Sequence, residues 1–309
     1  MIANPYKSFG TEVLKAVLQY AQNKACLIFI VTALAAPAFA LPLVMESGKI
    51  TYISDRPDSL LLRQAHAIVQ QEQIQLQKAF GLTITDSMQI YFYYDRDVAS
   101  PHVHSVPYWS GGVAHSGSEI HIFGDNRMDW MTTFKHELFH ILIYQNEVDI
   151  PVWLNEGLAQ WYAGQSDWGK FVELGTATAR GKLIPLVDLD VILSFNHKRA
   201  SLGYGQALDA TRFLIKRQGA SILPYLLKPG DQRFRERFIQ ETGESVIDFE
   251  IAWRNELESR LWYFKVSRIP GVLWALSPLI VILAWFLKYR RGRKKLEEWE
   301  AEDRDHLMN

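Results

Sequence analysis

The sequence predicts an α+β domain, with strands in its first half and helices in its second. Between residues 49 and 123, short segments rich in β-branched and aromatic residues stand beside one long amphipathic segment. From residue 130 almost to residue 259, apolar residues recur mainly at helical spacing. No internal repeat or low-complexity segment interrupts residues 45–262. We therefore expect one domain, with a cleft where the two halves meet.

The first half is expected to hold four strands and one helix. Residues 49–54 alternate in polarity, and residues 88–94 (MQIYFYY) are rich in aromatic and β-forming residues. Residues 113–123 (VAHSGSEIHIF) predict two short strands around a Ser-Gly-Ser turn. Residues 59–80 carry apolar residues at helical spacing, and Gly81 follows as the glycine that closes the helix.

The second half is predicted to be a series of helices. Gly124-Asp-Asn is a helix-start signal, and apolar residues follow at helical spacing from Met128 to Leu142. After a break at 146–151, a helix at 152–163 begins directly behind a proline. Further helices are expected at 166–174, 185–193, 205–217, 220–227 and 234–259.

The segment MTTFKHELFH, at 131–140, lies on the first of these helices and has the spacing His-Glu-x-x-His. Positions i and i+4 of a helix are about 40° apart, so His136 and His140 point the same way and can hold one ion. Glu137 borders the same face and can reach a water on that ion. Glu156, on the next predicted helix, offers a third ligand. Two histidines and one glutamate are a common ligand set of catalytic zinc, which leaves the fourth position to water.

HELFH followed by WLNEGLA resembles the gluzincin metallopeptidases, in particular the peptidase MA-like domains of bacteria, over residues 105–220. The resemblance implies a gluzincin-like metalloprotease domain, with a mixed sheet packed on the HExxH helix and a mainly helical C-terminal half. It makes His136, His140 and Glu156 the ligands of one Zn²⁺ per chain, and Glu137 the general base. These roles are those of a zinc metallopeptidase that hydrolyses peptide bonds with a metal-activated water.

The resemblance also implies a donor to the tetrahedral oxyanion. Related enzymes supply it from a later helix, commonly as a tyrosine or histidine. Residues 201–207 (SLGYGQA) resemble the corresponding aminopeptidase segment, so Tyr204 is the candidate catalytic residue and His197 is its substitute. A tyrosine that only packs at a helix start is the other interpretation of Tyr204.

The chain departs from the family pattern at two places. Thermolysin-like members place an aspartate four residues after the glutamate ligand to orient a zinc histidine. This chain has Gln160 there, whose amide can still accept that hydrogen bond. Gluzincin aminopeptidases carry a glutamate that captures the substrate's free amine, and residues 111–115 (GGVAH) have none. We therefore expect an endopeptidase, in which Gly111 and Gly112 let a peptide approach the sheet edge.

Four further histidines lie on or near the strands that precede the HExxH helix: His102, His104, His115 and His121. We expect them on turn and strand surfaces rather than in a second metal site.

Residues 1–44 predict a signal peptide or an uncleaved signal anchor. Three lysines precede an apolar run at 25–44, and the run closes on the small-residue site Ala38-Phe39-Ala40. The basic region is long for a signal peptide, which leaves the anchor open. The single cysteine, Cys26, lies in this leader, so no disulfide framework is expected.

Residues 269–287 hold nineteen residues without a charge and predict a transmembrane helix, with a buried core helix as the alternative. A basic run at 288–295 follows, and basic residues stay on the cytoplasmic side. We therefore expect residues 45–262 to be periplasmic or extracellular, held at the cytoplasmic membrane by this helix. Residues 288–309 would be a cytoplasmic tail.

The bulk composition indicates neither a nucleic-acid-binding nor a disordered chain, because hydrophobic residues make up 48 % and the formal net charge is −1. The leading hypothesis is a membrane-anchored zinc endopeptidase acting on protein or peptide substrates. The alternatives are a non-catalytic binding or assembly module on the gluzincin fold and a zinc hydrolase of a non-peptide substrate. Glu137 discriminates the enzyme from the module, because a scaffold needs no unligated carboxylate beside the metal.

Overall fold

The computed structural model describes residues 28–29, 43–96, 99, 103, 106–107, 110–124, 130–165, 168–266 and 276–293. The chain forms two compact units. The first lies within Met1–Phe171 and Ile184–Trp253, and the second within Val172–Leu183 and Arg254–Asn309.

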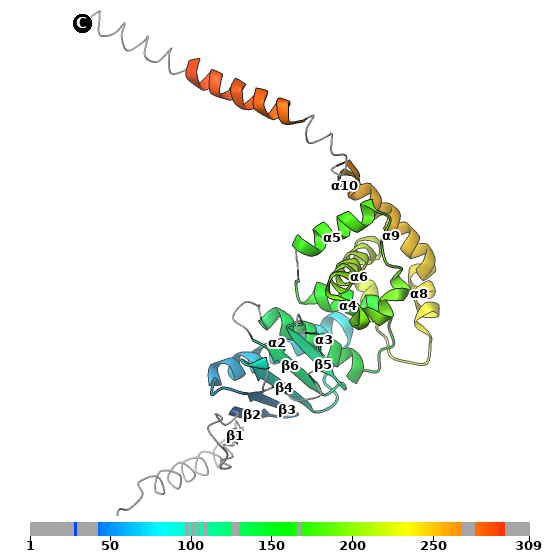
Figure 1. Cartoon of the computed structure of the whole chain (residues 1–309). Coiled ribbons are helices and arrows are strands. Elements are labelled where there is room, and N and C mark those ends of the chain that lie inside the picture. The colour runs from blue at the N-terminus through cyan, green and yellow to red at the C-terminus, as the bar shows by residue number, and fades with distance from the viewer. Residues whose placement is uncertain are drawn as a thin grey trace, which may run out of the picture. The chain divides into compact units, whose positions relative to one another are not determined.

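A six-stranded mixed sheet forms one layer of the first unit (Figure 1). In spatial order its strands are β1 (Ile28–Phe29), β2 (Leu43–Ser47), β3 (Ile50–Ser54), β4 (Met88–Tyr93), β6 (Glu119–Phe123) and β5 (Gly112–His115). Strands β3, β4 and β6 run parallel, whereas β1–β2, β2–β3 and β5–β6 are antiparallel pairs. The predicted α+β class and mixed sheet are confirmed, and β5 is an edge strand of the described sheet.

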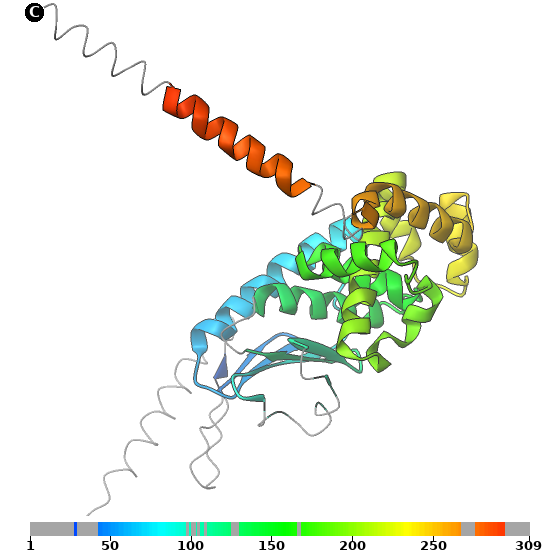
Figure 2. The ribbon, with the colours of Figure 1, turned by 45° about the horizontal axis from the view of Figure 1, so that its top comes forward.

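The buried face of the sheet packs on two helices, α2 (Ser59–Phe80) and α3 (Trp130–Gln145), as Figure 2 shows. Alternate residues of β4 and β6 point toward these helices and are at most 3 % exposed: Ile90, Phe92, Ile120 and Ile122. The period of two in a strand puts these side chains on one face, and their burial supplies the hydrophobic contact with α3. The HExxH helix is therefore held against the side of the sheet at which β5 is the edge strand.

The predicted helix at 59–80 is confirmed as α2, and both its ends are capped. The carboxylate of Asp58 accepts hydrogen bonds from the N–H groups of Leu60 and Leu61, at 3.1 and 2.9 Å. Gly81 takes the left-handed conformation with φ 75° and donates its N–H to the carbonyl of Gln77. These two signals are local, which is why the sequence predicts this helix well.

The remainder of the described chain is mostly helical. Its helices are α4 (Val152–Tyr162), α5 (Trp168–Ala179), η3 (Leu186–Ser194), α6 (His197–Gln218), η4 (Ala220–Ile222), α7 (Leu223–Leu226), α8 (Phe234–Thr242), α9 (Val246–Arg260) and α10 (Trp262–Val266). The single helix predicted at 234–259 is two helices, because Gly243 ends α8 in the left-handed conformation. α6 begins eight residues before the predicted start at 205, with the Asn196 side chain as its cap.

Helices α4 and α6 pack at very short range. A Cβ on Gly157 of α4 would lie 2.0 Å from Thr211 Oγ1 and 2.3 Å from the carbonyl oxygen of Ala207, both on α6. Only glycine permits this approach. The contact fixes the spacing between the helix that carries Glu156 and the helix that carries Tyr204.

The prediction of a C-terminal transmembrane helix is wrong. The described helix at 276–293 contains only residues 276–287 of the predicted span, and basic residues occupy its end. None of the described helices has the length and apolar character needed to cross a membrane. Residues 269–275 and 294–309 lie outside the described residues.

Most of the predicted leader at 1–44 also lies outside the described residues. The exceptions are residues 43–44, at the start of β2, and Ile28–Phe29, which pair with β2 as the short strand β1.

Candidate active site

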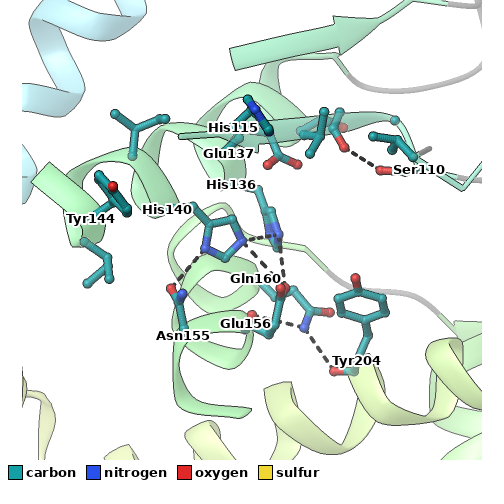
Figure 3. A pocket seen from close by; sticks show the side chains of 18 of the residues that line it. Ser110, His115, His136, Glu137, His140, Tyr144, Asn155, Glu156, Gln160 and Tyr204 are labelled. Atoms are coloured by element: carbon teal, nitrogen blue, oxygen red, sulfur yellow. Dashed lines mark hydrogen bonds and ion pairs between the residues drawn. The ribbon is translucent and has the colours of Figure 1, made fainter. Parts of the chain in front are cut away.

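A pocket of about 950 Å³ opens in the first unit beside the HExxH helix (Figure 3). Its lining comes from the edge strand β5, from α3 and α4, and from the first turns of α6. The pocket contains the five residues that the sequence singles out: His136, Glu137, His140, Glu156 and Tyr204. The predicted cleft between the strand-rich half and the helical half is therefore present.

Three side chains converge at the pocket floor. The Nε2 atoms of His136 and His140 lie 3.0 Å apart, and Oε2 of Glu156 lies 3.4 and 3.6 Å from them, respectively. Each of the three side chains is only 12 to 15 % exposed. Residues on successive turns of α3 and on the facing turn of α4 are thus brought to one point, as the His-x-x-x-His spacing predicts.

The three residues fit a zinc ion. Ligand atoms held tetrahedrally at 2.0–2.2 Å from one ion lie about 3.4 Å apart, close to the three separations in the protein. Oε2 of Glu156 is buried and makes no hydrogen bond among the described residues, although it faces both imidazoles. A buried carboxylate oxygen directed at two ring nitrogens is well placed to bind a cation.

The pKa values of the cluster favour an anionic Glu156. Burial disfavours its charge, but the two histidines overcome this and hold the pKa of its carboxyl well below the usual range. Burial would lower the pKa of His140, whereas the negative charge of Glu156 raises it to about 9. Glu156 therefore keeps its negative charge at neutral pH, as a carboxylate ligand of a metal must.

Glu137 lies beside the cluster but is not one of its three members. Its residue is 7 % exposed, and burial raises the pKa of its carboxyl, an effect that the neighbouring histidines partly oppose. Figure 3 shows its carboxylate on the β5 side of the two histidines. There the backbone N–H of Ala114 bonds to it. The pocket thus combines a metal-binding set with a separate, buried carboxylate.

The comparison with known families agrees with this arrangement. A family model of the Peptidase MA superfamily matches residues 68–258, which is more than half of the chain and includes the whole cluster. The chain belongs to the Peptidase MA superfamily. The family predicted from HELFH and WLNEGLA is thereby confirmed, and with it a metallopeptidase-like domain. Among curated proteins no match is found.

Gly112 lies in close contact with α3 in this Peptidase MA domain. A Cβ at this position would lie 2.9 Å from Thr133 Cγ2 and 3.0 Å from Glu137 Cγ. The glycine therefore lets the edge strand lie directly against α3, next to the buried carboxylate.

The orienting partner of a cluster histidine is Asn155, which the sequence analysis did not consider. Its Oδ1 lies 3.0 Å from Nδ1 of His140, so the ring turns its Nε2 toward Glu156. Gln160, the predicted partner, bonds to no histidine: its Nε2 donates to the carbonyls of Glu156 and Tyr204, and its Oε1 accepts from Lys170. The feature of the sequence that could have indicated this role of Asn155 is its position directly before Glu156.

Tyr204 and His197, the two candidate oxyanion donors, both line the pocket. Tyr204 is half-buried on α6, and burial, followed by the charges of Glu156 and Glu137, raises the pKa of its hydroxyl. It therefore keeps its proton at neutral pH and remains a donor. His197 is exposed at the start of α6.

One wall of the pocket is held by Arg96, which the sequence analysis missed. Its guanidinium donates to the carbonyls of Ser110, Val106 and Pro107, at 3.0, 3.2 and 2.9 Å. It also stacks on the ring of Phe123, 4.2 Å from the centroid. Arg96 thereby joins the wall segment that contains Val106, Pro107 and Ser110 to Phe123 at the end of β6.

The four other histidines considered in the sequence differ in where they lie. His121 was expected on the surface, but it is fully buried. Its ring stacks on Tyr91 and contacts the Tyr93 hydroxyl and the Glu119 carboxylate. His115 is exposed and lines the pocket. His102 and His104 lie outside the described residues.

Proposed function

We propose that the protein is a zinc-dependent endopeptidase with one zinc ion per chain, bound by His136, His140 and Glu156. The observation that carries this proposal is Glu137: a buried carboxylate next to the metal-binding set, with a raised pKa, and not a member of that set. A binding module needs the scaffold and its packing. It does not need a desolvated carboxylate beside a metal, whose burial is costly without a chemical role.

His136, His140 and Glu156 would hold a zinc ion, which would supply a coordinated water with a pKa lowered toward ~7 and polarisation of the substrate carbonyl. Glu137 takes a proton from the water as it attacks the peptide carbonyl, and then delivers that proton to the leaving amine. Burial raises the pKa of Glu137, which makes its carboxylate a stronger base for the first of these two steps. Tyr204 donates its hydroxyl hydrogen to the oxyanion that develops on the carbonyl oxygen.

An endopeptidase agrees best with the edge strand. β5 is an edge strand, so an extended peptide can add to it through backbone hydrogen bonds. Residues 111–115 contain no carboxylate that would bind a free amino terminus. The pocket extends along β5 from Ser110 to Gly117, which accommodates several residues of a polypeptide on either side of the cleaved bond.

The test is the Glu137→Gln variant of the purified protein. The amide has nearly the size of the carboxylate and leaves all three proposed ligands in place, so zinc content should stay near one per chain. It cannot accept the proton, so cleavage of an unfolded protein substrate should fall by about 10³-fold or more. Glu147→Gln is the matched control, because it makes the same change in charge at an exposed glutamate and should cleave like the parent.

Equal cleavage by parent and Glu137→Gln at equal zinc content would show that Glu137 is not the base. A parent protein that neither binds zinc nor cleaves any peptide would favour the binding or assembly module. Zinc binding with hydrolysis of non-peptide esters or amides alone would favour the hydrolase of a non-peptide substrate.

A further inference from the structure

Gln160 is completely buried between α4 and α6, and both ends of its amide are used. Its Nε2 donates to the carbonyl oxygen of Glu156 at 3.1 Å and to the carbonyl oxygen of Tyr204 at 3.0 Å. Its Oε1 accepts from Nζ of Lys170 at 3.2 Å. One side chain therefore joins the backbone of the proposed ligand helix to the backbone of the helix that carries Tyr204 (Figure 3).

Lys170 adds a second link to the same tyrosine. Its Nζ lies 5.7 Å from the centroid of the Tyr204 ring, within the range of a cation–π contact. Gln160 thus bears on Tyr204 in two ways: directly at the backbone carbonyl, and through the lysine at the ring.

The surrounding packing makes this link effective. Because Gly157 already brings the backbones of α4 and α6 into contact, the two helices have little freedom to slide apart at that point. Gln160 lies about one turn further along α4. Its hydrogen bond to the Tyr204 carbonyl restricts how far the first turns of α6 can rotate and tilt against α4. The hydrogen bond to a named carbonyl is directional, whereas the apolar contacts around it are not.

We propose that Gln160 is a positioning residue for Tyr204, which sets the place of the tyrosine hydroxyl over the pocket floor. This inference rests on the proposed function, in which Tyr204 donates to the oxyanion. The glutamine occupies the position at which thermolysin-like peptidases place an aspartate that orients a zinc histidine. In this chain that position serves the oxyanion side of the reaction instead of the metal side.

The consequence is a loss of turnover without loss of metal. A donor displaced by about 1 Å from a developing charge can lower the rate by up to about 10²-fold. We expect Gln160→Met, which keeps the length and bulk of the side chain but makes no hydrogen bond, to lower kcat about tenfold. KM and zinc content should remain within about twofold of the parent, because the ligands and the edge strand are untouched.

A double-mutant cycle with Tyr204→Phe separates positioning from general loosening. If Gln160 acts through the tyrosine hydroxyl, removing the hydroxyl should cancel its effect, and Gln160→Met should change kcat less than twofold in the Tyr204→Phe background. Equal losses in both backgrounds would overturn the inference, since Gln160 would then act independently of Tyr204. An unchanged kcat of Gln160→Met in the parent background would overturn it as well.

Gln206→Met is the matched control. Gln206 is another fully buried glutamine, two residues after Tyr204 on α6, but its amide bonds to the backbone N–H and carbonyl of Ile184. Its replacement also removes one buried side-chain amide, here from α6, the helix that carries Tyr204, and should leave kcat within twofold of the parent. A tenfold loss of kcat in this control would contradict a specific role of Gln160.

Amide hydrogen exchange provides a readout that needs no activity. Gln160→Met should exchange faster at residues 203–208 than the parent, and Gln206→Met should exchange faster around Ile184. Gln160→Asn, whose shorter side chain cannot span to the Tyr204 carbonyl, is measured in the same way if the methionine variant fails to fold. Unchanged exchange at 203–208 in a folded variant would overturn the inference.

The two levels of proposal fail differently. Loss of cleavage in Glu137→Gln together with full activity of Tyr204→Phe would leave the peptidase intact and remove the role of Gln160. A parent without zinc and without cleavage would remove the peptidase, and with it the positioning role, even if exchange shows that Gln160 holds α6.

Discussion

The two histidines of the metal-binding set are held in different ways. Nδ1 of His140 has the Asn155 amide oxygen at 3.0 Å, whereas Nδ1 of His136 is buried without a hydrogen-bond partner among the described residues. A histidine that binds a metal usually donates its other N–H to a neighbour, which fixes the tautomer and the ring orientation. His140 is therefore the ring whose orientation is fixed by the protein, and His136 depends more on packing and on the ion itself.

Asn155→Ala should consequently weaken zinc binding. The variant keeps all three ligands but frees the His140 ring to turn, and loss of such a partner typically lowers metal affinity by about 10- to 100-fold. Competition with a chelator of known affinity measures the change. Asn146→Ala is the control, because Asn146 bonds to the backbone at Thr83 and Leu142, away from the metal-binding set. If Asn155→Ala binds zinc as tightly as the parent, the orienting role is refuted.

The meeting of the three proposed ligands could be predicted from the sequence because their geometry is mostly local. The i, i+4 spacing brings His136 and His140 together on any α-helix, and the chemistry of zinc calls for a third ligand such as Glu156. The partners of Asn155 and Gln160 could not be predicted in the same way. They depend on how α4 faces α3 and α6, and single-residue spacing carries no information about that.

At the scale of elements, the contact between β5 and α3 determines where Glu137, the proposed general base, lies. Gly112 has backbone and side-chain atoms within about 3 Å of its missing Cβ: Thr133 Cγ2, Glu137 Cγ and the carbonyl oxygen of His121. Two of these sit on the HExxH helix and one on the neighbouring strand. A side chain at this point must push the edge strand away from the helix or displace Glu137.

We expect Gly112→Ala to lower both stability and turnover. Overpacking of this kind costs about 1–3 kcal/mol in the free energy of unfolding, measured by denaturant titration. Zinc content should be retained, since no proposed ligand is touched. Gly124→Ala provides the comparison, because the nearest atom to its Cβ would be the Tyr93 carbonyl oxygen at 3.8 Å. The packing argument is wrong if both variants are equally stable and equally active.

Which elements the sequence could predict depends on where their signals lie. The helix α2 has Asp58 before it and Gly81 after it, and its predicted bounds agree with the structure. The first turns of α6 were missed because two glycines stand in them. A Cβ on Gly203 would lie 2.8 Å from Ile192 Cδ1, so this glycine permits tight packing of α6 against η3 and marks no turn. Only the tertiary neighbour reveals this.

At the scale of the whole molecule, the proposed site lies entirely in the first compact unit. Its two halves come from separate stretches of the chain: the strands and α3 supply the base and two ligands, and α4 and α6 supply the third ligand and the oxyanion donor. The site can therefore form only after the helical half has packed on the strand half. Removal of residues beyond α4 should leave at most an incomplete centre.

The place of action stays a prediction from the leader at 1–44. If the protein is exported and processed at Ala38-Phe39-Ala40, the N-terminal sequence of the mature form should begin at Leu41. Such processing would also remove β1, which pairs with β2 in the full chain. A full-length protein with its domain outside the membrane would indicate the signal anchor, and a protein recovered only from the cytoplasm would contradict export.

A zinc titration of the metal-free protein, followed by the rate at which it cleaves an unfolded protein substrate, tests the central claim most directly. Metal is removed with a chelator, the chelator is removed, and zinc is returned in fractions of one equivalent. We predict that the rate rises in proportion to added zinc and levels off at one zinc per chain, because one set of three ligands holds the ion that activity requires. Full cleavage by the metal-free protein, or no cleavage after one zinc has bound, would contradict the assignment of this Peptidase MA domain as a zinc-dependent endopeptidase.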